Sequence, residues 1–197
     1  MENPRPLQII LDAFSAPTSD KISQLLVSFR PYLIPKGRIL VGQGQVSSAL
    51  YFLERGVMRT YYTRGSEDIT SLLVADGGVV CIAASFFGQA PSEETLETLE
   101  DCVVYSLSYE AYRKLSASDY GIAGLTIQLL EQHLIGFGDR VKIFKYLTVD
   151  ERISHYISHP SSVFRRIPDH YIATYLGTTS ATFSRSLKNI LRKKNKE

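Results

Sequence analysis

Residues 168–194 constrain the fold of this chain more than any other stretch, because their pattern predicts two helices joined by a tight turn. The first helix carries small or aliphatic residues at helical spacing: Ile172, Ala173 and Leu176. Gly177 follows where a helix ends, and Thr179 and Thr182 stand where a second helix would be capped. Ala173 supplies the small side chain that lets the helices touch, and Gly177 turns the corner. The stretch is therefore predicted to form a helix-turn-helix.

The second predicted helix has two distinct faces. Its apolar face holds Phe183, Leu187, Ile190 and Leu191. Its outward face holds Ser180, Ala181, Ser184, Arg185 and Lys188. Short polar groups beside one arginine suit the major groove of duplex DNA, where base edges offer acceptors to arginine and serine. The alternative is an αα-hairpin of a helical bundle whose outer face carries solvated charge.

Charge is segregated along the chain. Residues 163–197 hold eight basic and two acidic residues, a net charge of +6, whereas the other 162 residues hold 14 basic and 18 acidic residues, a net charge of −4. A concentrated basic end is the electrostatic signature of a polyanionic partner. This favours the interpretation that residues 168–194 read double-stranded DNA.

Size and composition set broad limits. A length of 197 residues leaves room for one or two domains, and a hydrophobic content of 44% is enough for a folded core. No run approaches 18 apolar residues, and the N-terminus lacks the basic-then-apolar order of a secretory signal, so we expect a cytoplasmic protein with no membrane partner. Cys81 and Cys102 stand in apolar, strand-like contexts, and we expect buried, reduced thiols.

Residues 32–108 have a β-rich texture interrupted by glycine. Strands are predicted near residues 38–41, 49–54, 57–63, 69–74, 79–82 and 103–108. Turns are predicted at Gly37, Gly42, Gly44, Gly56, Gly65 and Gly77. Short strands at regular spacing indicate an antiparallel roll, and two short helices at residues 6–15 and 19–30 are predicted to precede it.

Residues 120–146 are predicted to form one long helix, after a short helical piece at residues 108–116. The stripe along this helix comprises Ile122, Leu125, Leu129, Leu130, His133, Leu134, Phe137, Val141, Phe144 and Lys145. A stripe this long exceeds what one roll can cover, so we expect a parallel homodimer through this helix. The alternative is a helix that its own domain covers completely.

A hinge is predicted directly after the long helix. Thr148 and Glu151 have the spacing of a capping box, which predicts a new helix that ends near residue 158, before Pro160. Residues 163–167 have the pattern of a short strand. The predicted division is a sensor roll over residues 1–117, a dimerisation helix and hinge over 118–147, and a helix-turn-helix domain over 148–197.

The order of roll, long helix, capped helix and helix-turn-helix resembles the Crp/Fnr family of transcription regulators. The resemblance rests on the segments KGRILVGQG, ALYFLERGVMRTYY, LTVDERI and YIATYLGTTSATFSRSLK, and it covers nearly the whole chain. It implies an α+β fold: a double-stranded antiparallel β-roll of the cyclic-nucleotide-binding type with flanking helices, a dimerisation helix, and a winged-helix-like domain. Because the chain ends soon after Lys196, the wing is expected to be truncated.

The resemblance also implies DNA contacts. The recognition helix would begin at Ser180, with base-reading positions on Ser180, Ala181 and Arg185. Arg185 is the expected guanine contact, whereas Ala181 cannot accept a hydrogen bond from a cytosine amine, so the operator should differ from the family's best-known type. Ser184 is expected at base edges or phosphates. The phosphate backbone is expected to be held by Thr179, Thr182, Lys188, Arg192, Lys193 and Lys194. A contact with RNA polymerase is left open.

The roll departs from the family's cyclic-nucleotide site. Cys81 and Ile82 stand where family members carry a Gly-Glu pair for the ribose, and Glu93, Glu94 and Thr95 stand near the expected Arg-Ser pair for the phosphate. No arginine or lysine occurs between Arg64 and Arg113, so nothing there would neutralise a cyclic phosphate. We expect no cAMP binding and no cofactor. An unidentified apolar or cationic effector would meet Cys81, Ile82, Ala83, Ser85, Phe86, Glu93, Glu94 and Thr95, or the roll is packed and empty.

Other classes of function find little support. Residues 32–108 contain no histidine, which a metal-dependent enzyme built on such a roll would need. His155 and His159 are four residues apart, but no third ligand accompanies them, so neither a metal site nor enzymatic activity is expected. The remaining alternative is a signalling module that does not bind DNA and whose roll binds a small ligand or a protein partner.

Overall fold

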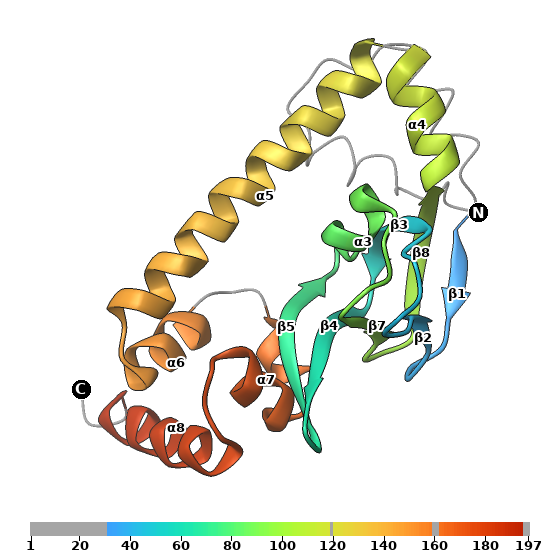
Figure 1. Ribbon diagram of the computed structural model, residues 1–197. Helices are drawn as coiled ribbons and strands as arrows, with labels where there is room; N and C mark the ends of the chain where they lie inside the picture. Colours follow the sequence, from blue (N-terminus) through green and yellow to red (C-terminus); the bar gives the residue numbers. More distant parts are fainter. Residues whose placement is uncertain (1–30, 119, 159–161, 195–197) are drawn as a thin grey trace, which may run out of the picture. The chain divides into compact units, whose positions relative to one another are not determined.

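A computed structural model of the chain describes residues 31–118, 120–158 and 162–194 (Figure 1). The described residues belong to two compact units. The first unit holds the described residues of 31–60 and 73–133, and the second holds those of 61–72 and 134–194. The helices predicted at residues 6–15 and 19–30 lie outside the described residues.

The predicted antiparallel roll is confirmed, and the described part of the chain contributes eight strands to it. They are β1 (Tyr32–Ile34), β2 (Ile39–Val41), β3 (Ala49–Arg55), β4 (Val57–Arg64), β5 (Glu67–Ala75), β6 (Val79–Val80), β7 (Thr95–Thr98) and β8 (Cys102–Ser108). They make two four-stranded sheets in the orders β1-β8-β3-β6 and β2-β7-β4-β5. The pairs β1–β8, β2–β7, β3–β6 and β3–β8 are antiparallel.

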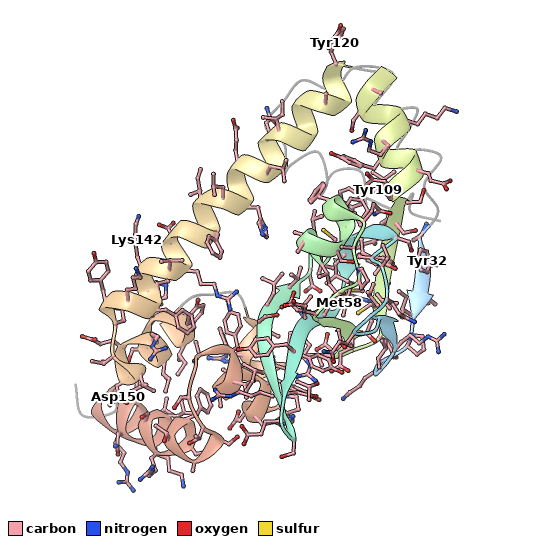
Figure 2. All side chains as sticks on the ribbon, in the orientation of Figure 1. Tyr32, Met58, Tyr109, Tyr120, Lys142 and Asp150 are labelled. Atoms are coloured by element: carbon pink, nitrogen blue, oxygen red, sulfur yellow. The ribbon has the colours of Figure 1, made fainter. Side chains whose placement is uncertain are left out.

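The core of the roll is made by apolar side chains from both of its sheets. Leu53 of β3, Val57 and Met58 of β4, Leu96 of β7 and Val104 of β8 are fully buried, and Leu53 lies opposite Val104 in the β3–β8 ladder. Figure 2 shows Met58 among the side chains that fill the roll. Burying such side chains contributes roughly 1.5–3 kcal/mol each, which is what holds the short strands together.

Glycine turns join the strands largely as predicted. Positive φ angles occur at Gly37, Gly44, Gly56, Gly65 and Gly77, whereas Gly42 has none and donates its N–H to the side chain of Gln45 at 2.8 Å. Gly56, with a φ of 121°, has the tightest surroundings of these turns: a Cβ atom there would lie 2.5 Å from Sγ of Cys102. Only glycine therefore fits the turn between β3 and β4.

Three elements of the first unit escaped prediction. Strands β1 and β7 and helix α3 (Ala83–Gly88) were not expected. The strand predicted at residues 79–82 is shorter than expected, because the chain turns at Cys81 into α3.

Helix α4 (Tyr109–Ser118) follows β8 and packs on α3. Phe86 of α3 contacts Tyr109 and Tyr112 of α4, with its ring 5.5 Å from that of Tyr109, and Phe87 contacts Tyr112. This aromatic cluster fixes α3 against α4.

The long helix occurs as predicted. Helix α5 spans Tyr120–Tyr146, and its residues up to His133 belong to the first unit while those from Leu134 belong to the second. Figure 2 shows the side chains of Tyr120 and Lys142 directed away from this helix. Among the described helices, none is both long enough and apolar enough to cross a bilayer.

The second unit contains the helices that follow α5. They are α6 (Val149–Ser158), a 3-10 turn η1 (Ser162–Arg165), α7 (Asp169–Tyr175) and α8 (Ser180–Lys194) (Figure 1). The capping box at the start of α6 is confirmed, since the Thr148 N–H donates to the Glu151 carboxylate at 2.8 Å. That bond lowers the pKa of Glu151. The core of this unit includes Ile153 of α6, Ile172 of α7, Leu176 directly after α7 and Phe183 of α8, all of which are buried.

The strand predicted at residues 163–167 is wrong. The segment folds as η1, in which Arg166 N–H donates to the carbonyl of Val163 at 3.0 Å. Phe164 packs on Tyr156 with ring centroids 5.4 Å apart, and Ile167 is buried, so the apolar side chains follow a helical rather than an alternating spacing. Between residues 162 and 194 no strand is assigned, and the winged part of the expected domain has no counterpart in that described stretch.

Candidate nucleic-acid interface

The turn between α7 and α8 is built by backbone hydrogen bonds that close the end of α7. Gly177 N–H donates to Thr174 O at 3.0 Å, and Thr178 N–H donates to Ala173 O at 2.9 Å. This pair of bonds is the Schellman arrangement, which requires a left-handed residue, and Gly177 supplies it with a φ of 70°. The predicted helix end at Gly177 is therefore present.

The start of α8 is capped by Thr179. Its Oγ1 accepts the N–H of Thr182 at 3.2 Å, and its carbonyl accepts the N–H of Phe183 at 2.8 Å. Thr182, which was also predicted as a cap, lies inside the first turn, where its hydroxyl accepts from the Thr179 hydroxyl at 3.1 Å. Gly177 ends α7 and Thr179 begins α8, so only Thr178 stands between these two positions. The direction of α8 therefore depends on the geometry of this turn.

Helix α8 packs on its neighbours with a face slightly different from the predicted one. Ala173 and Phe183 are buried as expected, but Ser186 is buried too, whereas Leu191 is 47% exposed. At about 100° per residue, Ser186 lies about 60° to one side of Phe183 and Leu191 about 80° to the other. The buried stripe therefore includes Ser186 and excludes Leu191.

The outward face of α8 carries the residues predicted to read DNA. Its exposed members are Ser180, Ala181, Arg185, Lys188, Asn189 and Arg192, with Thr179 exposed just before the helix and Thr182 and Ser184 partly exposed. The side chains of Lys193 and Lys194 lie outside the described residues. Helix α8 contains no acidic residue, so its whole outward face is positive or neutral.

Two features of the outward face of α8 add to the prediction of its DNA-reading residues. The Arg185 guanidinium lies along its own helix, with Nε 3.3 Å from Ala181 O and Nη2 3.4 Å from Thr182 Oγ1. These bonds are long and exposed, so little is lost when the side chain turns outward. Asn189 was not predicted, although its position four residues after Arg185 places it on the same face.

A substitution at the turn tests its geometry. Gly177→Ala is expected to lower the free energy of unfolding by about 1–2 kcal/mol, because alanine resists a positive φ. Its Cβ would also lie 3.2 Å from both Nη1 of Arg152 and Cε1 of Phe144. Urea unfolding followed by circular dichroism measures the change.

Gly136→Ala is the matched control for this change. Gly136 lies within α5, and a Cβ there would have no described atom within 4 Å, so alanine should leave stability unchanged or raise it by about 0.5–1 kcal/mol. A Gly177→Ala chain as stable as the wild type contradicts the left-handed turn.

The residues proposed to line the roll are partly engaged in its structure. Ser85 Oγ donates to Ala90 O at 2.5 Å and accepts from Ser47 N at 2.9 Å. Ile82 and Phe86 are buried, and Ala83 is exposed. Cys81 is only half-buried, yet burial raises the pKa of its thiol to about 12 and that of Cys102 to about 11, so both thiols stay protonated and unreactive at neutral pH.

The acidic side of the roll is open to solvent. Glu93 is exposed and Glu94 partly exposed, while Thr95 is buried and accepts from Gln43 N at 3.2 Å. The roll does contain a buried cation that precedes the stretch between Arg64 and Arg113, namely Arg59 of β4. Its Nε donates to Glu97 of β7 at 2.6 Å, so Arg59 is already paired with a carboxylate. Among the described residues, no group of histidine, cysteine and acidic side chains is arranged to hold a metal ion.

A second exposed surface runs along α5. Its apolar residues include Ile127, Leu130, Leu134, Phe137 and Val141, which alternate at intervals of three and four residues. Leu134 is 70% exposed and Phe137 60%. Alternating intervals of three and four are the heptad seam of a two-stranded coiled coil. Phe144, predicted to continue the stripe, instead lies within the second unit between two arginine side chains.

Comparisons with known proteins agree with this architecture. Residues 33–119 match the family model of the cyclic nucleotide-binding domain. No curated protein matches the chain. Among solved structures, FixK2 from Bradyrhizobium japonicum superposes with a TM-score of 0.71 at 16% identity, covering 84% of this chain and 85% of that one.

Two further structures are similar over most of their length. A protein from Eubacterium rectale, described as a transcriptional regulator of the crp/fnr family, gives a TM-score of 0.70 at 17% identity and covers 92% of this chain and 88% of its own. The c-di-GMP-responsive global regulator CLP from Xanthomonas campestris superposes with a TM-score of 0.68 at 16% identity. The match covers 89% of this chain and 93% of that one. At these identities the likeness establishes a shared fold.

Proposed function

We propose that this chain, which shares the fold of Crp/Fnr regulators and whose roll matches the cyclic nucleotide-binding domain, is a cytoplasmic, homodimeric transcription regulator that binds a specific DNA sequence. The observation that carries the proposal is the outward face of α8. It is exposed, free of acidic residues, and held by a capped turn at one end of the helix. A rigid positive helix of this kind fits the major groove.

Within this proposal the exposed residues of α8 divide into two roles. Arg185 reads a guanine, because a guanidinium can donate two bonds to the acceptors on its major-groove edge. Ser180, Ala181 and Ser184 lie close to the bases and offer only short side chains. Contacts to the phosphate backbone come from Thr179, Thr182, Lys188, Arg192, Lys193 and Lys194, and they fix the position of the helix without reading sequence.

Dimerisation through α5 accounts for its exposed apolar seam. A parallel pair of these helices would cover Leu130, Leu134 and Phe137 and present two copies of α8 to the same side of a duplex. In a two-fold dimer of this kind the recognition helices enter successive major grooves about 34 Å apart. The domain boundaries after residues 117 and 147 belong to the same proposal.

The operator itself provides the first test. Selection of bound fragments from a random DNA pool by the purified wild-type chain should enrich a rough palindrome whose half-sites are about one helical turn apart. Enrichment of a single unrepeated site, or of no site, would contradict dimeric recognition.

The roll is proposed not to respond to cAMP. Glu93 is exposed where a cyclic phosphate would need a cation, and Arg59 is already paired with Glu97. Addition of cAMP at 100 times a micromolar dissociation constant would add about 2.7 kcal/mol to stability if it bound. We expect no rise in melting temperature and no heat in a calorimetric titration. Micromolar binding by calorimetry would refute this prediction.

A further inference from the structure

Three elements of the second unit meet at Gly177. The bare Cα of this residue lies against the side chains of Phe144, in the last turn of α5, and Arg152, in the first turn of α6. Gly177 itself begins the connection to α8, whose cap follows two residues later. The end of the long helix and the start of the proposed recognition helix are therefore joined through two side chains.

Arg152 makes the central contacts of this junction. Its Nη1 donates to the carbonyl of Leu176 at 2.7 Å, and its Cζ lies 4.9 Å from the centroid of the Phe144 ring. Leu176 O belongs to the end of α7, where carbonyls lack partners within the helix and the helix dipole is negative, so a cation is favoured there. The Nε of Arg152 is buried and has no hydrogen-bond partner among the described residues.

A second set of contacts joins α5, α6 and the end of α7. The Arg140 guanidinium of α5 lies 5.7 Å from the Phe144 ring and 4.5 Å from the ring of Tyr175, the last residue of α7. Tyr175 contacts Tyr156 of α6 with ring centroids 5.6 Å apart. Phe144 is thus held between Arg140 and Arg152, and each of these arginines also contacts the end of α7.

We propose that Arg152 is a positioning residue for DNA recognition, because it fixes the direction of α8 relative to α5 by joining Phe144 to the carbonyl before Gly177. The inference rests on the proposed function. In a dimer formed through α5, the orientation of α8 relative to α5 determines the distance between the two copies of α8. Arg152 would therefore set which spacing of half-sites the dimer accepts, without contacting DNA.

The test compares the wild-type chain with Arg152→Met on a series of duplexes. The duplexes carry the half-sites that the wild type selects from a random pool, separated by the selected spacing or by one or two base pairs more or fewer. We expect Arg152→Met to lose roughly tenfold in affinity for the selected spacing, the scale of one charge-assisted hydrogen bond. Its affinities for the other spacings and for random DNA should stay within about twofold of the wild type.

Three further variants make the result decisive. Arg152→Lys should retain most of the spacing preference, because its ammonium can still donate to Leu176 O. Lys142→Met removes a charge that pairs with Asp139 at 3.1 Å, and it should retain the preference in full. Phe144→Leu keeps an apolar side chain and removes the ring, so it should flatten the preference even if Arg152→Met fails to fold.

The outcomes separate this inference from the function on which it rests. A wild-type chain that selects no duplex overturns the proposed function and the inference with it. A wild type with a clear spacing preference, together with an Arg152→Met or Phe144→Leu chain that keeps the preference, overturns the inference alone. Equal weakening on every duplex, random DNA included, also overturns it, because that pattern marks a general loss of structure.

Discussion

Replacing Leu134 with glutamate is expected to leave the chain monomeric and to reduce its affinity for the selected duplex by at least a hundredfold. Leu134 lies in the middle of the exposed seam of α5, where 70% of its surface is open to solvent. In a parallel pair, two glutamates would face each other across a dry seam, and burying uncompensated charge costs about 3–5 kcal/mol. Sedimentation equilibrium measures the oligomeric state, and fluorescence anisotropy measures the affinity.

Ile135→Glu is the matched control for the dimer. Ile135 is the next residue along α5 and is 65% exposed, but it lies off the heptad seam. The same glutamate there should leave the chain dimeric. If Leu134→Glu remained dimeric, or if both variants dissociated equally, the coiled-coil interface through α5 would be wrong.

Arg185→Ala is expected to weaken binding to the selected duplex by about 1–3 kcal/mol and binding to random DNA very little. The reason is that a base contact is lost only where the correct base is present. Arg185 is exposed on α8, and its two hydrogen bonds to its own helix are 3.3 and 3.4 Å long, so the side chain is available for a ligand. Affinities for both DNAs, measured at one salt concentration, give the comparison.

Lys188→Ala provides the contrasting pattern. Lys188 lies on the same exposed face and is proposed to contact a phosphate. Its loss should weaken binding to the selected and the random DNA similarly, and should reduce the slope of log K against log salt by about 1. If Arg185→Ala behaved in the same way, Arg185 would be a phosphate contact and base reading would have to come from other residues of α8.

Much of this architecture could be predicted because its signals are local. Gly177, Thr179, Thr148 and Glu151 define helix ends by their own backbone bonds, and the periodicity of residues 120–146 fixes the bounds of α5. The turn glycines of the roll act in the same way, since a positive φ is a property of a single residue.

What escaped prediction depends on contacts between distant segments. Strand β7 has only four residues and lies in an acidic stretch, and it forms because β2 and β4 lie on either side of it in the sheet. The segment at residues 163–167 holds the β-branched and aromatic residues that strands favour, but Phe164 packs on Tyr156 and the backbone turns. Arg152 acts on a carbonyl 24 residues away, and no pattern in the sequence marks that pairing.

DNA recognition by the wild-type chain is tested most directly by its affinities for the selected duplex and for a scrambled duplex of equal length, measured across a series of salt concentrations. We predict that the selected duplex binds at least about a thousandfold more tightly, and that log K falls by about 0.9 for each phosphate neutralised as log salt rises. Equal affinity for the two duplexes, or no binding to either at low salt, would contradict a DNA-reading regulator and would favour a signalling module whose partner binds the roll.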